Sequence, residues 1–448
     1  MEHVAYIALG SNLGDRAAHI HAALDDLATY ARVEATSFLY DTPPAYVLDQ
    51  PRFLNAACKV RTQIGPRDLL DRLKAAERRL GRIPTVPNSP RTIDLDILFY
   101  DDAVVQDGDL AIPHPRLAER DFVLQPMRDL AADLHHPVFD ETVEVLLARL
   151  SSPPLPWVMP IASHLWTWGA RTYVMGILNV TPDSFSGEGL GEGPAMVERA
   201  LAVAQQQVLD GADCVDVGGQ STRPGHRVIP AEEEIARVVP VIETLAKALP
   251  VPVSVDTFRA EVARAALDAG AHLINDVWGL RFDPGVAELA AARHVPLVVM
   301  HNQARNDDAA YQARWPEPPS PIPSDADVVE IVRKELSAQL GAAIARGVPR
   351  WHLMADPGIG FGKSVAQHLS LIRNLDRLVQ MGYPVLFGAS RKGFIGKLMG
   401  DLPPAERVEG SVAAAVLALT RGAHVLRVHD VRATVRAVRV ADAVLASV

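Results

Sequence analysis

Two aspartates and an arginine stand close together in the segment RTIDLDILFY, residues 91–100. Apolar residues alternate with Asp94 and Asp96, which predicts a strand with both carboxylates on one face. Paired carboxylates suit Mg²⁺ bridging the phosphates of a nucleotide, and Arg91 could contact a phosphate oxygen. Such alternation is also common on a solvated strand face, so the spacing alone leaves both interpretations open.

A second set of polar residues follows eight apolar runs in the later part of the chain. One polar residue lies at or just past the end of each run, and the set is Asn179, Asp216, Asp256, Asn275, His301, Asp356, Ser390 and His429. Eight strands alternating with longer helical segments predict a parallel (β/α)₈ TIM barrel, whose chemistry lies where strands end. Taken singly, any aspartate here could be a helix cap. Together they predict a catalytic mouth.

The elements that position these residues divide the chain. At 448 residues it exceeds the usual size of one hydrophobic core, so we expect two domains. Short apolar runs and helical segments at 15–30 and 66–80 predict an α/β or α+β domain over residues 1–150. The Pro- and Ser-rich stretch after it predicts a linker over 151–170, and the barrel then occupies 171–448.

Composition excludes several classes of partner and site. The formal net charge of −10 gives no basic excess for nucleic acid, and no apolar stretch is long enough to predict a membrane span or export signal. Cys58 and Cys214, the two cysteines, stand far apart, so we expect no disulfide framework, no cysteine zinc site and a cytoplasmic location. The run GIGFGKS before residue 365 invites a nucleotide-loop interpretation, but that motif requires glycine at Pro357.

A series of short motifs occurs in the N-terminal part. They are Gly10-Ser11-Asn12-Leu13-Gly14, Thr42-Pro43-Pro44, Phe53-Leu54-Asn55-Ala56-Ala57, Glu77, Gly81-Arg82, Pro90-Arg91-Thr92 with Asp94-Leu95-Asp96, and Pro113-His114-Pro115. In order and approximate spacing they resemble the hydroxymethyl-dihydropterin pyrophosphokinase family. The resemblance implies a ferredoxin-like α+β fold and transfer of the pyrophosphoryl unit of ATP to a pterin hydroxymethyl group.

The same resemblance implies roles for individual residues. Asp94 and Asp96 would hold Mg²⁺, with Glu77 as a supporting acid. The remaining assignments are Arg82 and Arg91 for catalysis, Arg82, Arg91, His114 and Arg120 for ATP, and Thr42, Phe53, Asn55 and Phe122 for the pterin. The chain departs from many family members at Asn88-Ser89, where they have Trp-Gly, so an aromatic residue of the loop is absent.

A further series of motifs runs through the later part. They are residues 175–186 (MGILNVTPDSFS), 218–225 (GGQSTRPG), 255–257 (VDT), 274–276 (IND), 356–358 (DPG), 360–363 (GFGK), 390–392 (SRK) and 427–430 (RVHD). This series resembles dihydropteroate synthase, with Gln220 in place of the usual glutamate. The resemblance implies condensation of a pterin pyrophosphate with p-aminobenzoate.

The synthase resemblance again implies residue roles. Physically, a pterin edge needs paired acceptors and a donor in a mostly dry pocket. The implied pterin contacts are Asp256, Asn275, Met300, Asp356 and Lys392. The implied p-aminobenzoate contacts are Thr222, Pro224, Phe361, Ser390 and Arg391. The implied pyrophosphate contacts are Asn179, Arg223, Arg427 and His429, with Mg²⁺ near Asn179; Lys392, Arg427 and His429 would serve catalysis.

The sequence therefore predicts a bifunctional folate-biosynthesis enzyme acting on small molecules, with no nucleic-acid or membrane partner. Two alternatives remain for the function: a synthase with a degenerate N-terminal scaffold, and a non-catalytic pterin-binding protein. A barrel that transfers a methyl group to a corrinoid protein is a further enzyme class that the pterin contacts alone would allow. Apolar stripes in the helical segments 404–421 and 431–446 are compatible with a homodimer through the C-terminal domain. The Pro-rich loop 302–327 has no predicted role.

Overall fold

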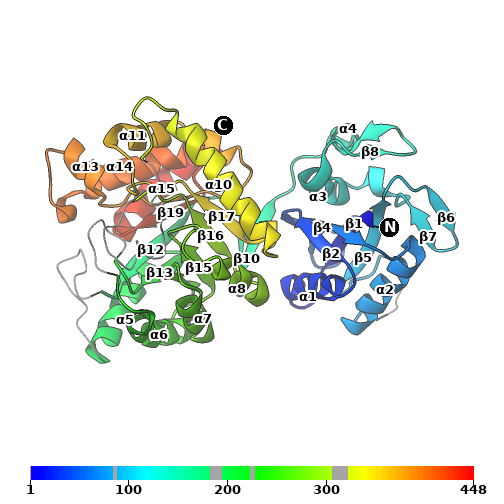
Figure 1. Cartoon of the computed structure of the whole chain (residues 1–448), viewed down its shortest axis with the longest axis horizontal. Helices are drawn as coiled ribbons and strands as arrows, with labels where there is room; N and C mark the ends of the chain where they lie inside the picture. The colour runs from blue at the N-terminus through cyan, green and yellow to red at the C-terminus, as the bar shows by residue number, and fades with distance from the viewer. Residues whose placement is uncertain (1, 84–87, 182–193, 222–227, 305–320, 448) are drawn as a thin grey trace. The chain divides into compact units, whose positions relative to one another are not determined.

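The computed structural model describes residues 2–83, 88–181, 194–221, 228–304 and 321–447. The chain folds into two compact units (Figure 1). The first comprises Met1–Pro160, Leu165–Thr167 and Pro349–Trp351, and the second comprises Ile161–His164, Trp168–Val348 and His352–Val448. Each unit is described by itself.

The first unit is built on a mostly antiparallel sheet with two pairs of helices. Its longer elements are β1 (His3–Ser11), α1 (Arg16–Ala28), β2 (Arg32–Thr36), β3 (Leu39–Thr42), β4 (Phe53–Thr62), α2 (Pro66–Arg79), β5 (Asp94–Tyr100), α3 (Asp121–Ala131), α4 (Val143–Leu150), β10 (Trp157–Ile161) and β11 (His164–Thr167). The strand order is β11-β10-β3-β4-β1-β5, with β2 also paired to β4. The succession β3-β4-β1-β5 is that of a ferredoxin-like βαββαβ fold, so the predicted fold class is confirmed.

The alternation of side chains along the strands supplies this unit with two cores. On β1, Ala5, Ile7 and Leu9 pack with α1 and α2, whereas Tyr6 packs with α3 and α4 on the other face. On β5, Leu95 and Ile97 belong to the first core. Asp94 and Asp96 alternate with them and therefore lie on the other face of the sheet, as their spacing predicts.

The segment that the sequence analysis treats as a linker, 151–170, forms two strands. Trp157 pairs with Tyr40 and Val158 with Leu39, so β10 extends the sheet of the first unit beside β3. The paired residues of β10 thus have backbone partners in the sheet. Residues 152–156, between α4 and β10, have no regular secondary structure.

The second unit is a ring of parallel strands with helices between them. The strands are β12 (Tyr173–Asn179), β13 (Cys214–Gly218), β14 (Val253–Asp256), β15 (Leu273–Asp276), β16 (Leu297–Met300), β17 (Leu353–Asp356), β18 (Leu386–Phe387) and β19 (Val425–Val428). The described helices are α5 (Pro194–Leu209), α6 (Ala231–Ala248), α7 (Ala260–Asp268), α8 (Gly285–Arg293), α10 (Val328–Ala345), α11 (Val365–Arg373), α12 (Asp376–Val379), α13 (Gly393–Leu398), α14 (Val408–Leu419) and α15 (Val431–Ala446).

The strand order β17-β16-β15-β14-β13-β12-β19-β18 is that of an eight-stranded barrel. A bridge between Ala355 and Val385 joins the two ends of this order, where Ala355 N donates to Pro384 O at 2.9 Å. The (β/α)₈ prediction is confirmed, and each of the eight predicted runs contains a strand.

The register of the strands sets the height of the polar residues along the barrel axis at its mouth. Asn179 pairs with Gly218, Gly218 with Asp256, and Asp256 with Asn275, so these positions lie in one row across β12 to β15. Met300 pairs with Asp356 in the same way on β16 and β17. The carboxyl ends of these strands therefore bring the residues to one edge of the barrel.

None of the helices in the described ranges combines the length and the apolar character that crossing a lipid bilayer demands.

Candidate functional site

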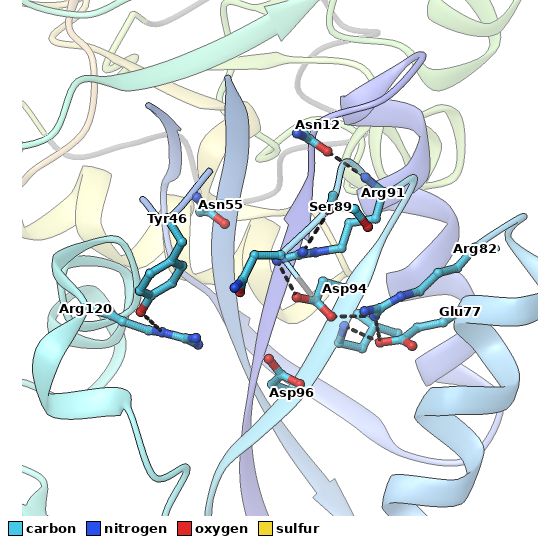
Figure 2. A network of polar contacts seen from close by, with 12 residues as sticks. Asn12, Tyr46, Asn55, Glu77, Arg82, Ser89, Arg91, Asp94, Asp96 and Arg120 are labelled. Atoms are coloured by element: carbon cyan, nitrogen blue, oxygen red, sulfur yellow. Dashed lines mark hydrogen bonds and ion pairs between the residues drawn. The ribbon is translucent and has the colours of Figure 1, made fainter. Parts of the chain in front are cut away.

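A cavity in the first unit opens between β5, the β3–β4 segment and the start of α3. Its lining includes Thr42, Phe53, Asn55, Arg91, Asp94, Asp96, Arg120 and Phe122, all of them predicted site residues. Figure 2 shows the two aspartates on β5, with Arg91 and Arg82 reaching Asp94 and with Tyr46 and Arg120 on the opposite side. The structure thus brings the predicted residues of this site together.

Asp94 is held by two arginines that come from different segments. Arg82 Nη1 lies 2.5 Å from Asp94 Oδ1, and Arg91 Nη2 lies 2.9 Å from Asp94 Oδ2. Burial opposes ionisation, but the charges of Arg91 and Arg82 outweigh it and lower the pKa of the Asp94 carboxyl. The carboxylate is therefore ionised at neutral pH. Asn12 Oδ1 accepts from Arg91 N at 2.8 Å and fixes the backbone of that arginine.

Two side chains of α2 reach the edge strand β5. Glu77 Oε1 accepts from Leu95 N at 2.8 Å, and Lys74 Nζ donates to Leu95 O at 2.9 Å, so the free edge of the sheet is satisfied. Lys74 Nζ also lies 2.7 Å from Glu77 Oε1 and 3.5 Å from Asp96 Oδ1. Burial opposes its charge, but Asp96 and Glu77 raise the pKa of Lys74 above its usual value. Lys74 therefore adds a cation beside the two aspartates.

The donor set suits a hard divalent cation whose coordination is completed by phosphate. Asp94 and Asp96 offer carboxylate oxygens on one strand face, the ligand type that Mg²⁺ prefers. Within the described ranges no group of three or more His, Cys, Asp and Glu side chains gathers as a metal cage. Two carboxylates surrounded by Lys74, Arg82 and Arg91 are instead typical of a site that binds a metal ion together with phosphate groups.

The other half of this cavity is shaped for a flat ring. Phe53 and Phe122 both line it, and Asn55 Nδ2 donates to Thr42 Oγ1 at 2.7 Å, which orients the amide. A Cβ at Gly10 would lie 2.8 Å from Asn55 Oδ1, so glycine at this position leaves room for the amide. Aromatic faces with one oriented amide can bind a polar heterocycle by stacking and by its edge.

The far side of the cavity carries cations. Arg120 Nε donates to Tyr46 Oη at 3.1 Å, and the Arg120 guanidinium lies 5.6 Å from the centroid of the Phe122 ring. His114 Nε2 lies 3.9 Å from Asp96 Oδ2, and burial lowers the pKa of its imidazole. Arg120 is thus positioned by aromatic rings, while His114 stands beside the Asp96 carboxylate.

The second unit carries a cavity of about 450 Å³ at the barrel mouth. It is lined by most of the predicted synthase residues, namely Asn179, Asp256, Asn275, Met300, Asp356, Phe361, Ser390, Arg391, Lys392, Arg427 and His429. Thr222, Arg223 and Pro224 lie outside the described residues, as do residues 182–186 of the motif at 175–186. Gln220 and Ser221, which come directly before Thr222 in the sequence, line the same cavity.

A buried ion-pair network forms the floor. Arg427 Nε donates to Asp216 Oδ2 and Arg427 Nη2 to Asp256 Oδ2, both at 2.6 Å, and Asn275 Nδ2 donates to Asp216 Oδ2 at 3.0 Å. Burial raises the pKa of Asp256 to about 7, with Arg427 opposing the shift and Asp216 adding to it. Among the described residues, Asp256 Oδ1 and Asn275 Oδ1 are buried without a hydrogen-bond partner. These oxygens are acceptors prepared for a ligand with N–H donors.

The opposite wall combines a carboxylate, an ammonium and a ring. Asp356 Oδ1 accepts from Gly358 N at 2.7 Å, and Lys392 Nζ lies 4.5 Å from the centroid of the Phe361 ring and donates to Ile359 O. Burial lowers the pKa of Lys392 to about 8, with Asp356 opposing the shift. Burial also raises the pKa of Asp356. The wall therefore offers one donor and one acceptor next to an aromatic face.

The outer rim links the strand end of β19 to the loop after β18. Ser390 Oγ accepts from His429 N at 3.1 Å and lies 3.1 Å from His429 Nδ1. Arg391 binds Asp430 through Nε at 2.9 Å and Nη2 at 2.5 Å, with a backbone φ of 58°. The paired contact turns the Arg391 guanidinium toward Asp430, so its aliphatic stem is the part that faces the cavity.

Most of the polar residues predicted at strand ends line the barrel cavity, and two of them do not. Asp216 is fully buried beneath Arg427 and does not line the cavity. His301 is also fully buried and lies 3.2 Å through Nε2 from Glu335 Oε2, away from the cavity lining. Two site residues were not predicted from the sequence. Lys74 stands one helical turn before Glu77, so helical spacing could have identified it. Arg407 lines the barrel cavity, and no sequence signal pointed to it.

Two family models match the chain in the order of the two units. The model for 7,8-dihydro-6-hydroxymethylpterin-pyrophosphokinase matches residues 6–132, and the model for pterin binding enzymes matches residues 175–429. Among solved structures, dihydropteroate synthase from Xanthomonas albilineans with 4-aminobenzoic acid is 46% identical, with a TM-score of 0.57. The match covers 64% of this chain and 98% of that chain.

Relatives that carry both parts match nearly the whole chain. A folic acid synthesis protein from Pneumocystis carinii is 38% identical over 98% of this chain, which spans 59% of the length of that relative. A mitochondrial folate synthesis bifunctional protein from Arabidopsis thaliana is 37% identical over 99% of this chain and 83% of its own length. The chain therefore belongs to the family of bifunctional folate synthesis proteins, with its pyrophosphokinase part ahead of its pterin binding enzyme part.

Proposed function

We propose that this protein catalyses two consecutive reactions on a pterin. In the first, ATP pyrophosphorylates 6-hydroxymethyl-7,8-dihydropterin, and in the second the product condenses with p-aminobenzoate to give 7,8-dihydropteroate and pyrophosphate. The observation that carries the proposal is that most of the side chains predicted for each reaction line a cavity, one in each unit.

In the first site, the pterin stacks between Phe53 and Phe122, and Asn55 with Thr42 reads its edge. Its hydroxymethyl oxygen attacks the β-phosphorus of ATP, the bond from that phosphorus to the oxygen of the α-phosphate breaks, and AMP leaves. Mg²⁺ held by Asp94 and Asp96 would neutralise phosphate charge when bound.

The arginines of the first site carry the charge of the transferring phosphates. Arg82 and Arg91 are held in place by Asp94, and an incoming phosphate takes over some of their hydrogen bonds. Arg120 extends the cationic side toward the nucleotide, and His114 contacts the nucleotide as a neutral imidazole, because burial lowers its pKa. Glu77 fixes Arg82 at 2.7 Å. Nothing in this transfer needs a covalent enzyme intermediate, so positioning and charge supply the rate.

In the second site, the pterin edge donates to Asp256 Oδ1 and Asn275 Oδ1, while Asp356 supplies a further acceptor and Lys392 a donor. Met300 packs against the ring. Asn179, Arg223, Arg427 and His429 bind the leaving pyrophosphate, and Asn179 would hold a Mg²⁺ ion that neutralises its charge when bound. Departure of pyrophosphate leaves a resonance-stabilised pterin cation, which the amine of p-aminobenzoate attacks with loss of one proton. Because the leaving charge develops first, these cationic and hydrogen-bonding side chains lower the barrier.

The p-aminobenzoate molecule lies at the outer part of the barrel cavity. Phe361 offers its ring, Ser390 its hydroxyl, and Arg391 its stem. The roles of Thr222 and Pro224, which lie outside the described residues, rest on the family resemblance. Arg391 is oriented by Asp430, which keeps the apolar stem beside the substrate.

A homodimer through the second unit is part of the proposal. Leu417 on α14 and Val440, Val444 and Leu445 on α15 are exposed apolar side chains, between 48% and 66% accessible. A set of exposed apolar residues on two neighbouring helices is typical of an interaction surface. The plant relative is named as mitochondrial, and the cytoplasmic location expected for this chain stays a prediction.

The proposed function is tested by supplying purified protein with the hydroxymethyl-dihydropterin, ATP, Mg²⁺ and p-aminobenzoate, and by following AMP and dihydropteroate. A parallel reaction starts from the pterin pyrophosphate. Formation of both products supports the two-step reaction. Dihydropteroate from the pyrophosphate alone would make the first unit a scaffold without activity, and no product from either start would leave a pterin-binding protein.

A further inference from the structure

Lys363 ends the glycine-rich run that resembles a nucleotide loop, and the proposed reactions give it no role. Its ammonium lies inside the protein and meets three backbone carbonyls: Gly358 O at 2.9 Å, Phe361 O at 3.2 Å and His301 O at 3.3 Å. Three carbonyl acceptors match the three N–H bonds of an ammonium group. Lys363 therefore closes the turn between Gly358 and Phe361 and ties it to the segment that follows β16.

The two segments are in direct backbone contact. A Cβ at Gly358 would lie 1.7 Å from His301 O, and a Cβ at Gly362 would lie 2.1 Å from the carbonyl carbon of Gln303. Both glycines have a φ of 66°, which side chains disfavour. Glycine at these two positions thus lets residues 358–362, here called the glycine segment, lie against residues 301–303.

Residues 301–303 are held from the other side by one carboxylate on α10. Glu335 Oε2 lies 2.5 Å from Arg281 Nη2, 2.9 Å from Gln303 Nε2 and 3.2 Å from His301 Nε2. Arg281 also donates to Asn302 O at 2.9 Å. Two donors, Arg281 and Gln303, bind a single carboxylate oxygen with the His301 ring beside it, and this charge-assisted contact ties the segments after β15 and β16 to the helix.

The glycine segment carries cavity residues on its inner side. Gly360 and Phe361 line the barrel cavity, and Lys392 donates to Ile359 O while its ammonium stands 4.5 Å from the Phe361 ring. A shift of this segment therefore moves both the ring proposed for p-aminobenzoate and the amine proposed for the pterin. The chain of contacts runs from Glu335 through His301 and Gln303 to these two groups.

We propose that Glu335 and Lys363 are positioning residues of the barrel site, which hold residues 301–303 against the glycine segment and so fix Phe361 and Lys392 in the cavity. The inference rests on the proposed synthase function. Neither side chain lines the cavity, so both act through the backbone that they fix.

The first test removes the carboxylate that faces solvent. Glu335 is 33% exposed, so the Glu335→Ala variant of the full chain should fold. We expect its KM for p-aminobenzoate and for the pterin pyrophosphate to rise about tenfold or more, because small misplacements of binding groups are costly. We expect kcat to change less, since the groups proposed to bind pyrophosphate are untouched. Glu335→Gln keeps an acceptor and should give intermediate KM values.

Glu330→Ala is the matched control. Glu330 lies on the same helix, 46% exposed, and pairs with Arg333 and Arg377 away from residues 301–303. It removes the same charge from α10 and should leave both KM values at the wild-type level. A KM that rises equally in both variants, or in neither, would overturn the proposal.

A second readout does not depend on turnover. Amide hydrogen exchange should become faster in residues 357–363 of Glu335→Ala and of Lys363→Met, with α14 and α15 unchanged. Faster exchange across the whole barrel would mean that the two residues serve general stability, which contradicts a positioning role. If the wild-type protein forms no dihydropteroate, the proposed function fails, and the exchange pattern still decides whether Glu335 and Lys363 hold the glycine segment.

Discussion

The two cavities handle charge in opposite ways. In the first unit, Asp94 and Arg82 are 20% and 28% exposed, and their ion pairs stand at the edge of a sheet. In the barrel, Asp216 is fully buried and Asp256 is 9% exposed, beneath the same arginine. Exposed pairs exchange partners at low cost, whereas buried pairs keep a fixed arrangement because separating them in a dry site is expensive.

This difference matches what each cavity is proposed to bind. A site for metal and triphosphate must release its own ion pairs as those charges arrive, so partial exposure suits it. A site that reads the edge of an uncharged ring needs acceptors fixed in advance, and Asp256 Oδ1 and Asn275 Oδ1 are buried in that state. Substitutions in one site should therefore change one reaction and leave the other unchanged.

The largest effect should come from the two carboxylates proposed to hold Mg²⁺ in the first site. Asp96→Ala removes one of these two proposed oxygen ligands and should lower kcat for AMP formation by about a hundredfold to a thousandfold. The reaction of the pterin pyrophosphate with p-aminobenzoate should keep its wild-type rate, which serves as the control for folding. Equal loss of both activities would contradict the separation of the sites.

In the barrel, the corresponding change acts on affinity for the ring. Asp256→Asn leaves Arg427 with one carboxylate and replaces an acceptor by a donor, so the Kd for the pterin pyrophosphate should rise about tenfold to a hundredfold. Isothermal titration with the full chain measures it. A Kd within twofold of the wild type would mean that Asp256 does not contact the pterin.

The buried groups should give the barrel reaction a narrow pH optimum. The pKa of Asp256 is raised to about 7, so its acceptor is lost by protonation as the pH falls below that value. The pKa of Lys392 is lowered to about 8, so its charge is lost as the pH rises above that value. The kcat/KM for the pterin pyrophosphate should therefore peak between these values, and each limb should approach a tenfold change per pH unit. A flat profile from pH 6 to 9 would contradict this.

A smaller effect is expected from Lys74, whose cation stands beside Asp96 in the first site. Lys74→Met should lower kcat for AMP formation about tenfold, because Glu77 loses a partner and the phosphates lose a nearby charge. Arg72→Met is the matched control, since Arg72 lies on the same helix and stacks on Tyr30 outside the cavity. The two variants should differ; equal rates would remove Lys74 from the site.

The smallest effect on turnover should come from the helices α14 and α15. Val440→Glu places a charge in the exposed apolar set, so the dimer should dissociate while the rate of dihydropteroate formation changes less than about twofold. Sedimentation measures the mass. Leu209→Glu on α5, at a leucine that is 80% exposed, should leave the dimer intact. A monomeric wild-type protein would rule out the homodimer.

The barrel could be predicted from the sequence because each strand is an apolar run with a polar residue at or shortly after its end. The sequence could not predict which of two adjacent residues faces the cavity. Met300 lines the cavity, so His301, the next residue, points to the other side of the strand and meets Glu335. Asp216 faces inward but two residues before the end of β13, one layer too deep to line the mouth.

Other features depended on pairing between distant segments. The stretch 151–170 contains β10, which pairs with Leu39 and Tyr40 more than a hundred residues earlier, and such pairing has no local signature. The contacts of Lys74 with Leu95 O and Asp96 likewise depend on how α2 packs against β5. By contrast, the common face of Asp94 and Asp96 could be predicted from the two-residue period of a strand alone.

Crossed assays of Asp96→Ala and Asp256→Asn decide whether the chain holds two separate active sites. Each variant is given either the hydroxymethyl-dihydropterin with ATP, Mg²⁺ and p-aminobenzoate, or the pterin pyrophosphate with p-aminobenzoate. Asp96→Ala should form dihydropteroate only from the pyrophosphate, and Asp256→Asn should form AMP at the wild-type rate but little dihydropteroate. Loss of AMP formation in Asp256→Asn, or of the pyrophosphate reaction in Asp96→Ala, would mean that the two sites are not separate.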